Sequence, residues 1–166
     1  MTHDELCDRA VRWLLKTKRC RLVLREVVSY AGEIPDAIGW QAGTGFSFLV
    51  ECKASRGDFL RDQKKWSRDP RNCHSMGQMR FYMAPPGLLR PDELPEGWGL
   101  LEVHGRRVRV VRDVDVARPL DPSGYRGELM HMLRGLRMAN GEDKLPTKKS
   151  AAFVQGELEG GVSDEC

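Results

Sequence analysis

The sequence has no apolar run near the ~20 residues that a bilayer-spanning helix needs, so we expect no membrane segment. The first residues include acids and lack the apolar core of a secretion signal, which favours a cytoplasmic protein. The five cysteines are an odd number and include no CxxC pair. This pattern indicates reduced thiols rather than a disulfide framework or a zinc ribbon.

What the chain does contain is enough residues, 166, for one domain with a hydrophobic core. We predict that this domain covers residues 1–138. Residues 139–166 are polar and glycine-rich and are predicted to form a flexible tail. The net charge of +3 is modest, but the stretch from Arg56 to Arg80 contains seven basic and three acidic residues. A local positive surplus of this kind attracts a phosphate backbone.

The periodicity of apolar residues predicts an α/β fold. Thr2 and Glu5 form a capping box that starts a helix over about 3–18. Two further helices are predicted over 58–66 and 125–138, the last of them packing Leu129, Leu133 and Leu136 against the sheet. Strands are predicted over 22–28, 35–41, 46–54, 80–84, 99–103 and 108–111. This order is typical of a mixed central sheet flanked by helices.

The most informative segment is the predicted hairpin whose loop is residues 42–45. If Gln41 pairs with Phe46, the register sets Asp36 directly opposite Glu51. Side chains alternate along a strand, so Lys53 shares a face with Glu51. Two acids and one amine are therefore expected to converge.

Directly opposed residues on neighbouring strands have Cβ atoms about 5 Å apart. Two carboxylates at such positions repel each other unless a cation lies between them. Oxygen donors with no requirement for His or Cys favour Mg²⁺ or Mn²⁺ over zinc. We therefore expect Asp36 and Glu51 to bind such an ion, with Lys53 orienting water or stabilising charge on the reacting phosphate. These groups suit phosphodiester hydrolysis.

Pro35-Asp36 followed by Glu51-Cys52-Lys53 resembles the motif of the PD-(D/E)XK nuclease superfamily. More narrowly, the segment from Pro35 to Val103 resembles the MmcB-like family of small DNA-repair-associated nucleases. The resemblance implies a restriction-endonuclease-like core of order αβββαβ, with extra strands and a C-terminal helix. It also implies a metal-dependent deoxyribonuclease of DNA repair, recombination or phage DNA processing, in which Asp36 and Glu51 bind the metal and Lys53 is the catalytic lysine.

The sequence leaves several supporting roles open. A third carboxylate would come from Glu5, Glu26 or Glu33. The supporting positions are Ser55, Asp58 and Gln63. Asp58 is favoured as a helix N-cap over a catalytic role, whereas Ser55 either contacts phosphate or ends a strand. Gln63 either supports the site or is solvated.

Basic residues beside the predicted centre are expected to contact the DNA backbone. They are Arg56, Arg61, Lys64, Lys65, Arg68 and Arg71, and Trp66 is a candidate for base stacking. A homodimer would suit cleavage of two strands. Two alternatives stay open: a DNA-binding module that keeps the nuclease fold but does not cut, and a protein-interaction factor that binds its partner through the tail.

Overall fold

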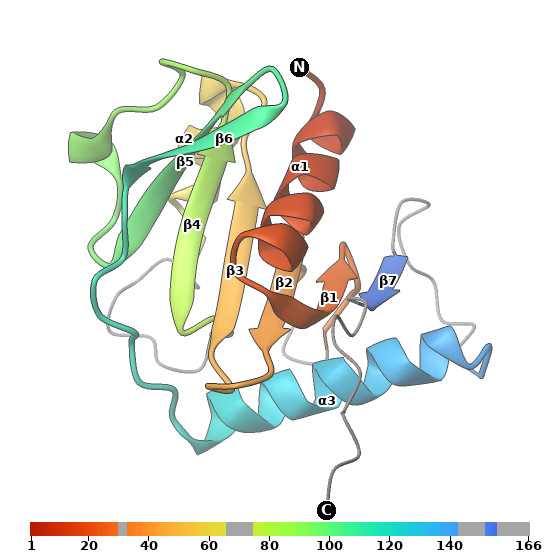
Figure 1. Ribbon diagram of the computed structural model, residues 1–166. Helices are drawn as coiled ribbons and strands as arrows, with labels where there is room; N and C mark the ends of the chain where they lie inside the picture. The colour runs from red at the N-terminus through yellow and green to blue at the C-terminus, as the bar shows by residue number, and fades with distance from the viewer. Residues whose placement is uncertain (30–32, 66–74, 143–151, 156–166) are drawn as a thin grey trace, which may run out of the picture.

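Seven strands make one mixed sheet in the order β6-β5-β4-β3-β2-β1-β7 (Figure 1). The computed structural model describes residues 1–29, 33–65, 75–142 and 152–155. The strands are β1 (Cys20–Arg25), β2 (Ala37–Gln41), β3 (Ser47–Cys52), β4 (Met79–Ala84), β5 (Trp98–His104), β6 (Arg107–Arg112) and β7 (Ala152–Gln155). The adjacent strands β3, β4 and β5 run parallel, and every other pair is antiparallel. The predicted α/β class and mixed sheet are confirmed.

Helices cover both faces of this sheet. Helix α1 (His3–Lys16) lies on one face, where its apolar side joins a core with Val23, Val50 and Phe81 (Figure 1). Helix α2 (Arg56–Asp62) and helix α3 (Pro122–Ala139) contribute to the core on the opposite face, and a short 3-10 turn, η2 (Pro91–Glu93), precedes β5. Because both faces are covered, every residue of β3 is buried. In the described part of the chain, no helix is long and apolar enough to cross a membrane.

Helix α1 begins as the sequence predicts. The Thr2 side chain accepts a hydrogen bond from the Glu5 amide, and the Glu5 carboxylate accepts one from the Thr2 amide. Leu6, Ala10 and Leu14 then follow at helical spacing and are buried against the sheet. The capping box therefore fixes where the helix starts, and the apolar side chains fix which face of the helix packs against the sheet.

Helix α3 turns a different face to the sheet from the one predicted. Leu129, Leu133 and Leu136 are 53, 45 and 48 % exposed, so the prediction that they pack inward is wrong. The buried side is instead formed by the residues Gly124, Glu128, His131, Arg134 and Gly135. At Gly135 a Cβ atom would lie only 2.4 Å from Leu24 Cδ2, so the missing side chain lets the helix approach β1 closely. The close approach of α3 to β1 and the contacts of its buried polar side chains therefore set the orientation of this helix.

His131 on this buried face makes stability depend on pH. The side chain is 0 % exposed, and neither ring nitrogen has a hydrogen-bond partner among the described residues. Burial, together with the nearby Arg134, lowers the pKa of His131 from 6.5 to about 4. Between these values the unfolded chain binds a proton that the folded chain rejects, so stability is lost as the pH falls through this range.

When the pH falls from 7 to 5, we expect the shifted pKa of His131 to lower the free energy of unfolding by about 2 kcal/mol. Urea unfolding of the wild type and of His131→Met at both pH values measures the difference. The variant should lose less stability than the wild type on acidification. An equal loss in the two proteins would mean that His131 does not cause the effect.

Several predicted boundaries shift for local reasons. β1 was predicted to run to residue 28 but ends at Arg25, because Glu26 adopts a positive φ of +50° that a strand does not accommodate. Helix α2 starts at Arg56, with Ser55 rather than the predicted Asp58 as its N-cap. The predicted flexible tail includes β7, which pairs with β1, whereas residues 143–151 and 156–166 lie outside the described part of the chain.

Candidate functional site

The β2–β3 hairpin has the predicted register. Ala37 pairs with Val50, Trp40 pairs with Ser47, and the Gln41 amide donates to the Phe46 carbonyl at 3.0 Å. One further step along this ladder places Asp36 at the position opposite Glu51. Asp36 Oδ2 accepts a hydrogen bond from the Cys52 amide at 2.7 Å, which fixes its carboxylate against the end of β3.

Lys53 lies among carboxylates just after the end of β3. Its Nζ is 3.1 Å from Glu51 Oε2 and 3.2 Å from Asp62 Oδ1. Asp62, at the end of α2, also accepts a hydrogen bond from the Tyr82 hydroxyl at 2.8 Å. The sequence did not single out Asp62, because a charged residue in a predicted surface helix carries no signal that it is buried. The structure thus adds a second acid to the predicted pair of Glu51 and Lys53.

The charges in this group support one another. Burial opposes ionisation of Asp36, but a hydrogen bond from His3, the charge of Lys53 and the Cys52 amide together lower its pKa. Burial likewise opposes the charge on Lys53, yet Glu51, Asp62 and Asp36 raise its pKa. Both shifts favour the charged forms, a carboxylate on Asp36 and an ammonium on Lys53. Asp36, Glu51 and Lys53 are only 5, 2 and 5 % exposed, so the group is almost closed to solvent.

A second group of polar side chains meets on the other side of Asp36. One ligand atom from each of His3, Cys7, Glu26 and Asp36 lies within 4.8 Å of all the others. Hydrogen bonds to Asp36 and then Cys7 raise the pKa of His3 to about 10. A hydrogen bond with Cys52, followed by one with His3, lowers the pKa of Cys7 to about 7 against the effect of burial. The sequence predicted oxygen ligands alone, whereas the structure brings nitrogen and sulfur to the same acid.

The three candidates for a third carboxylate have different positions. Glu26 Oε1 lies 3.6 Å from His3 Nε2, in the group that contains Asp36. Glu5 is exposed and belongs to the capping box of α1. Glu33 is buried elsewhere, where it accepts from the Met76 amide and lies 3.5 Å from Arg80. Of the three, the structure brings only Glu26 next to Asp36.

The predicted supporting residues hold α2 and its surroundings in place. Ser55 caps the helix by accepting from the Asp58 amide, and its hydroxyl donates to the Asp58 carboxylate at 2.9 Å. Gln63 donates to the Glu93 carbonyl at 2.9 Å. These contacts account for all three side chains without a bound ligand.

Three of the predicted DNA-contact residues form ion pairs within the protein. Arg56 pairs with Glu93, Arg61 with Asp58, and Lys65 with Asp62 at 2.8 Å. Lys64 is exposed. Arg68, Arg71 and Trp66 lie outside the described residues.

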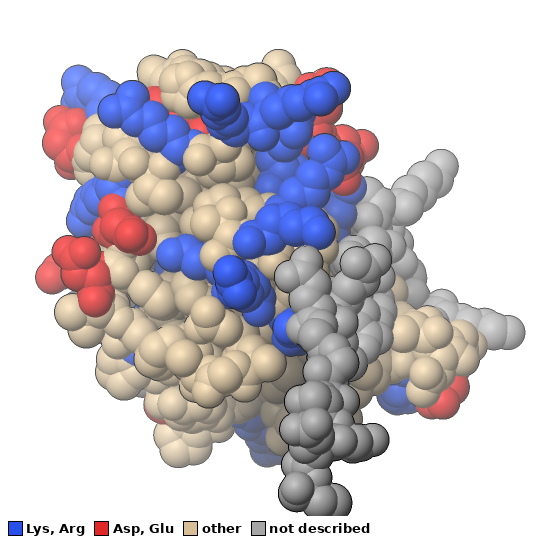
Figure 2. All heavy atoms as spheres, viewed as in Figure 1, with Lys and Arg blue, Asp and Glu red and all other residues tan. Residues whose placement is uncertain are grey.

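A broader basic surface lies where the sequence did not indicate one. Figure 2 shows Lys and Arg side chains gathered over α1 and the β5–β6 hairpin. Exposed cations of these elements include Arg12 and Lys16 on α1 and Arg107 and Arg109 on β6. The two elements are about ninety residues apart in the sequence, so a count of charge along the chain does not bring their cations together. Their joint field would attract a polyanion.

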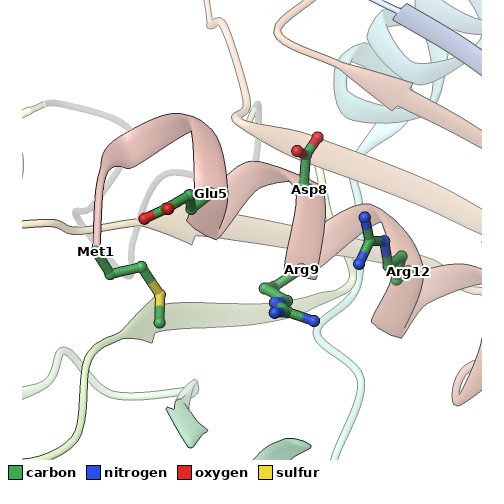
Figure 3. Close-up of a pocket in the computed structure, with 5 residues that line it drawn as sticks. All are labelled: Met1, Glu5, Asp8, Arg9 and Arg12. Atoms are coloured by element: carbon green, nitrogen blue, oxygen red, sulfur yellow. The ribbon is translucent and has the colours of Figure 1, made fainter. Parts of the chain in front are cut away.

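A hollow on the surface of α1 lies at one edge of this basic region. It is lined by Met1, Glu5, Asp8, Arg9 and Arg12, and Figure 3 shows the two arginines next to each other. None of the residues around Lys53 lines it. The hollow is therefore separate from the predicted reaction centre.

Comparison with known proteins gives a likeness of fold. No family model and no curated protein matches the chain. A solved structure, the SPO1766 protein of unknown function from Silicibacter pomeroyi, superposes with a TM-score of 0.54 at 20 % sequence identity. The match covers 88 % of this chain and 99 % of that one. It supports the arrangement of helices and strands and says nothing of activity.

Proposed function

We propose that this protein is a metal-dependent nuclease that hydrolyses DNA phosphodiester bonds, with Asp36, Glu51 and Lys53 at its reaction centre. The observation that carries the proposal is the contact of the Lys53 ammonium with the Glu51 carboxylate, in a hairpin whose register sets Asp36 opposite Glu51. Lys53 Nζ lies 3.1 Å from Glu51 Oε2, and its charge stabilises ionised Asp36. The basic surface over α1 and β6 supports a polyanionic substrate.

The donor chemistry of these residues fits the expected ion. Asp36 and Glu51 offer carboxylate oxygens, which Mg²⁺ and Mn²⁺ prefer. A bound ion would polarise the phosphate and favour deprotonation of attacking water. The Cys52 amide holds Asp36 in place, and Lys53 would supply positive charge for the developing phosphate oxyanion. We infer a restriction-endonuclease-like arrangement of the core.

A non-cutting DNA-binding module is the second candidate, and one observation favours it. All three predicted catalytic residues are at least 95 % buried, and Lys53 already has two carboxylate partners. Cleavage therefore requires the surrounding chain to open towards a phosphate, whereas binding through the surface cations does not. Either role suits DNA repair, recombination or phage DNA processing in the cytoplasm, and a homodimer would suit cutting of both strands.

The two candidates differ in a simple assay. The purified full chain is incubated with single-stranded, duplex and branched DNA in Mg²⁺, in Mn²⁺ and in excess chelator. A nuclease should cut at least one substrate only when the ion is present. Binding to the same panel without cutting in any condition would instead identify the non-cutting module.

A further inference from the structure

The four side chains beside Asp36 come together from three elements. His3 and Cys7 lie one helical turn apart on the same face of α1. Glu26 directly follows β1, and Asp36 directly precedes β2, its antiparallel partner. The Glu26 amide donates to the Asp36 carbonyl at 3.2 Å, so these two residues continue the strand pairing and face the helix together.

We propose that His3, Cys7, Glu26 and Asp36 form a Zn²⁺ site that ties the first turn of α1 to the adjoining ends of β1 and β2. A zinc ion takes four ligands at the corners of a tetrahedron, with bonds of about 2.0–2.3 Å, so its ligand atoms are separated by about 3.3–3.7 Å. From His3 Nε2 the distances are 3.3 Å to Cys7 Sγ, 3.4 Å to Asp36 Oδ1 and 3.6 Å to Glu26 Oε1. These three distances match the three edges that meet at one corner of such a tetrahedron, and the other three ligand atoms lie within 4.8 Å of one another.

The donor set selects the class of ion. A thiolate and an imidazole suit zinc and disfavour Mg²⁺, which prefers oxygen ligands. Glu26 and Asp36 are 2 and 5 % exposed, and a bound ion would take the place of the proton on His3 as the positive partner of these two acids. Cys7 is buried, and the His3 side chain is 39 % exposed, so the site is open to an ion from the His3 side.

This site differs from the proposed nuclease centre. The two share only Asp36, whose Oδ1 faces His3 while Oδ2 accepts from the Cys52 amide. Four protein ligands leave zinc no open position for water, which is typical of structural rather than catalytic sites. The zinc site would therefore stabilise the junction of α1 with the sheet and does not depend on cleavage.

Zinc binding by the metal-free full chain tests the proposal. Zn²⁺ is titrated against a chromophoric chelator, and Co²⁺ is added separately to record its visible and thiolate charge-transfer bands. We expect one equivalent of Zn²⁺ per chain, a Co²⁺ spectrum typical of a tetrahedral site with sulfur, and a higher melting temperature with zinc. His3→Gln and Cys7→Ser should each weaken binding at least about 10–100-fold, and Cys7→Ser should also remove the charge-transfer band.

Two further variants serve as controls for zinc binding at these four residues. Cys20→Ser alters a buried cysteine outside the group and should bind zinc as the wild type does. Lys53→Arg should also bind zinc fully, even if it abolishes cleavage, so failure of the nuclease proposal and failure of this one are told apart. Absence of stoichiometric zinc binding overturns the proposal. So does unchanged binding in both His3→Gln and Cys7→Ser, provided that melting curves show both variants folded.

Discussion

Replacing Lys53 by methionine is expected to reduce DNA cleavage by about 10²–10³-fold or more, because it removes the positive charge nearest the predicted reacting phosphate. DNA affinity should change much less, since Lys53 is buried and the exposed cations lie elsewhere. Cleavage rates under single-turnover conditions and binding by fluorescence anisotropy separate the two effects. Retention of full cleavage by the purified variant would refute the assigned role.

The stability of the variants needs its own control. Lys53→Met removes the ammonium that lies between Glu51 and Asp62, and taking an ionic partner from a buried carboxylate destabilises a fold. Lys53→Arg keeps the positive charge, so it should melt closer to the wild type while still cutting poorly, because a planar guanidinium does not reproduce the position of the amine. Arg126→Gln, on the exposed side of α3, should leave both activity and melting unchanged.

Glu128→Ala is expected to cause the largest loss of stability. The Glu128 carboxylate accepts hydrogen bonds from Trp40 Nε1 at 2.9 Å, Ser47 Oγ at 2.7 Å and the Gly77 amide at 2.8 Å. These groups are buried, so removing the acceptor leaves three donors without it, at a total cost of about 3 kcal/mol or more. Denaturant unfolding should show this loss.

Two further substitutions test whether the loss of stability in Glu128→Ala comes from the lost hydrogen-bond acceptor. Glu128→Gln keeps one acceptor oxygen but turns an amide NH₂ towards the donors, so its cost should be lower than that of Glu128→Ala and still clear. Glu96→Ala, at an exposed position, should stay within about 0.5 kcal/mol of the wild type. If Glu128→Ala and Glu96→Ala unfolded at the same denaturant concentration, the network would not anchor α3.

Local signals in the sequence predicted the hairpin well. The loop at residues 42–45 fixes the register, since each residue on β2 pairs with a residue on β3 within the same short hairpin. The same reasoning failed for α3. There the helical spacing of three leucines predicted the buried face, whereas the structure buries Glu128. Glu128 is buried through hydrogen bonds with Trp40, Ser47 and Gly77. These partners lie far from it in the sequence, so no local pattern predicts the contacts.

The side chains around Asp36 illustrate the same limit. His3 and Cys7 have the spacing of one helical turn, which was the available sign that they share a face. That they meet Glu26 and Asp36 depends on how α1 packs over β1 and β2, which a single sequence does not specify. Asp62 was missed for a related reason, because its burial comes from Lys53 and Tyr82 rather than from its own helix.

The pairing of β7 with β1 has a consequence for synthesis on the ribosome. Leu22 pairs with Gln155 and Arg25 pairs with Ala152. One edge of β1 therefore has no strand partner until residues 152–155 have been synthesised. Until then β1 presents unpaired amides and carbonyls to its surroundings, which is how nascent chains come to associate edge to edge. Folding of this sheet is therefore completed from the late part of the chain.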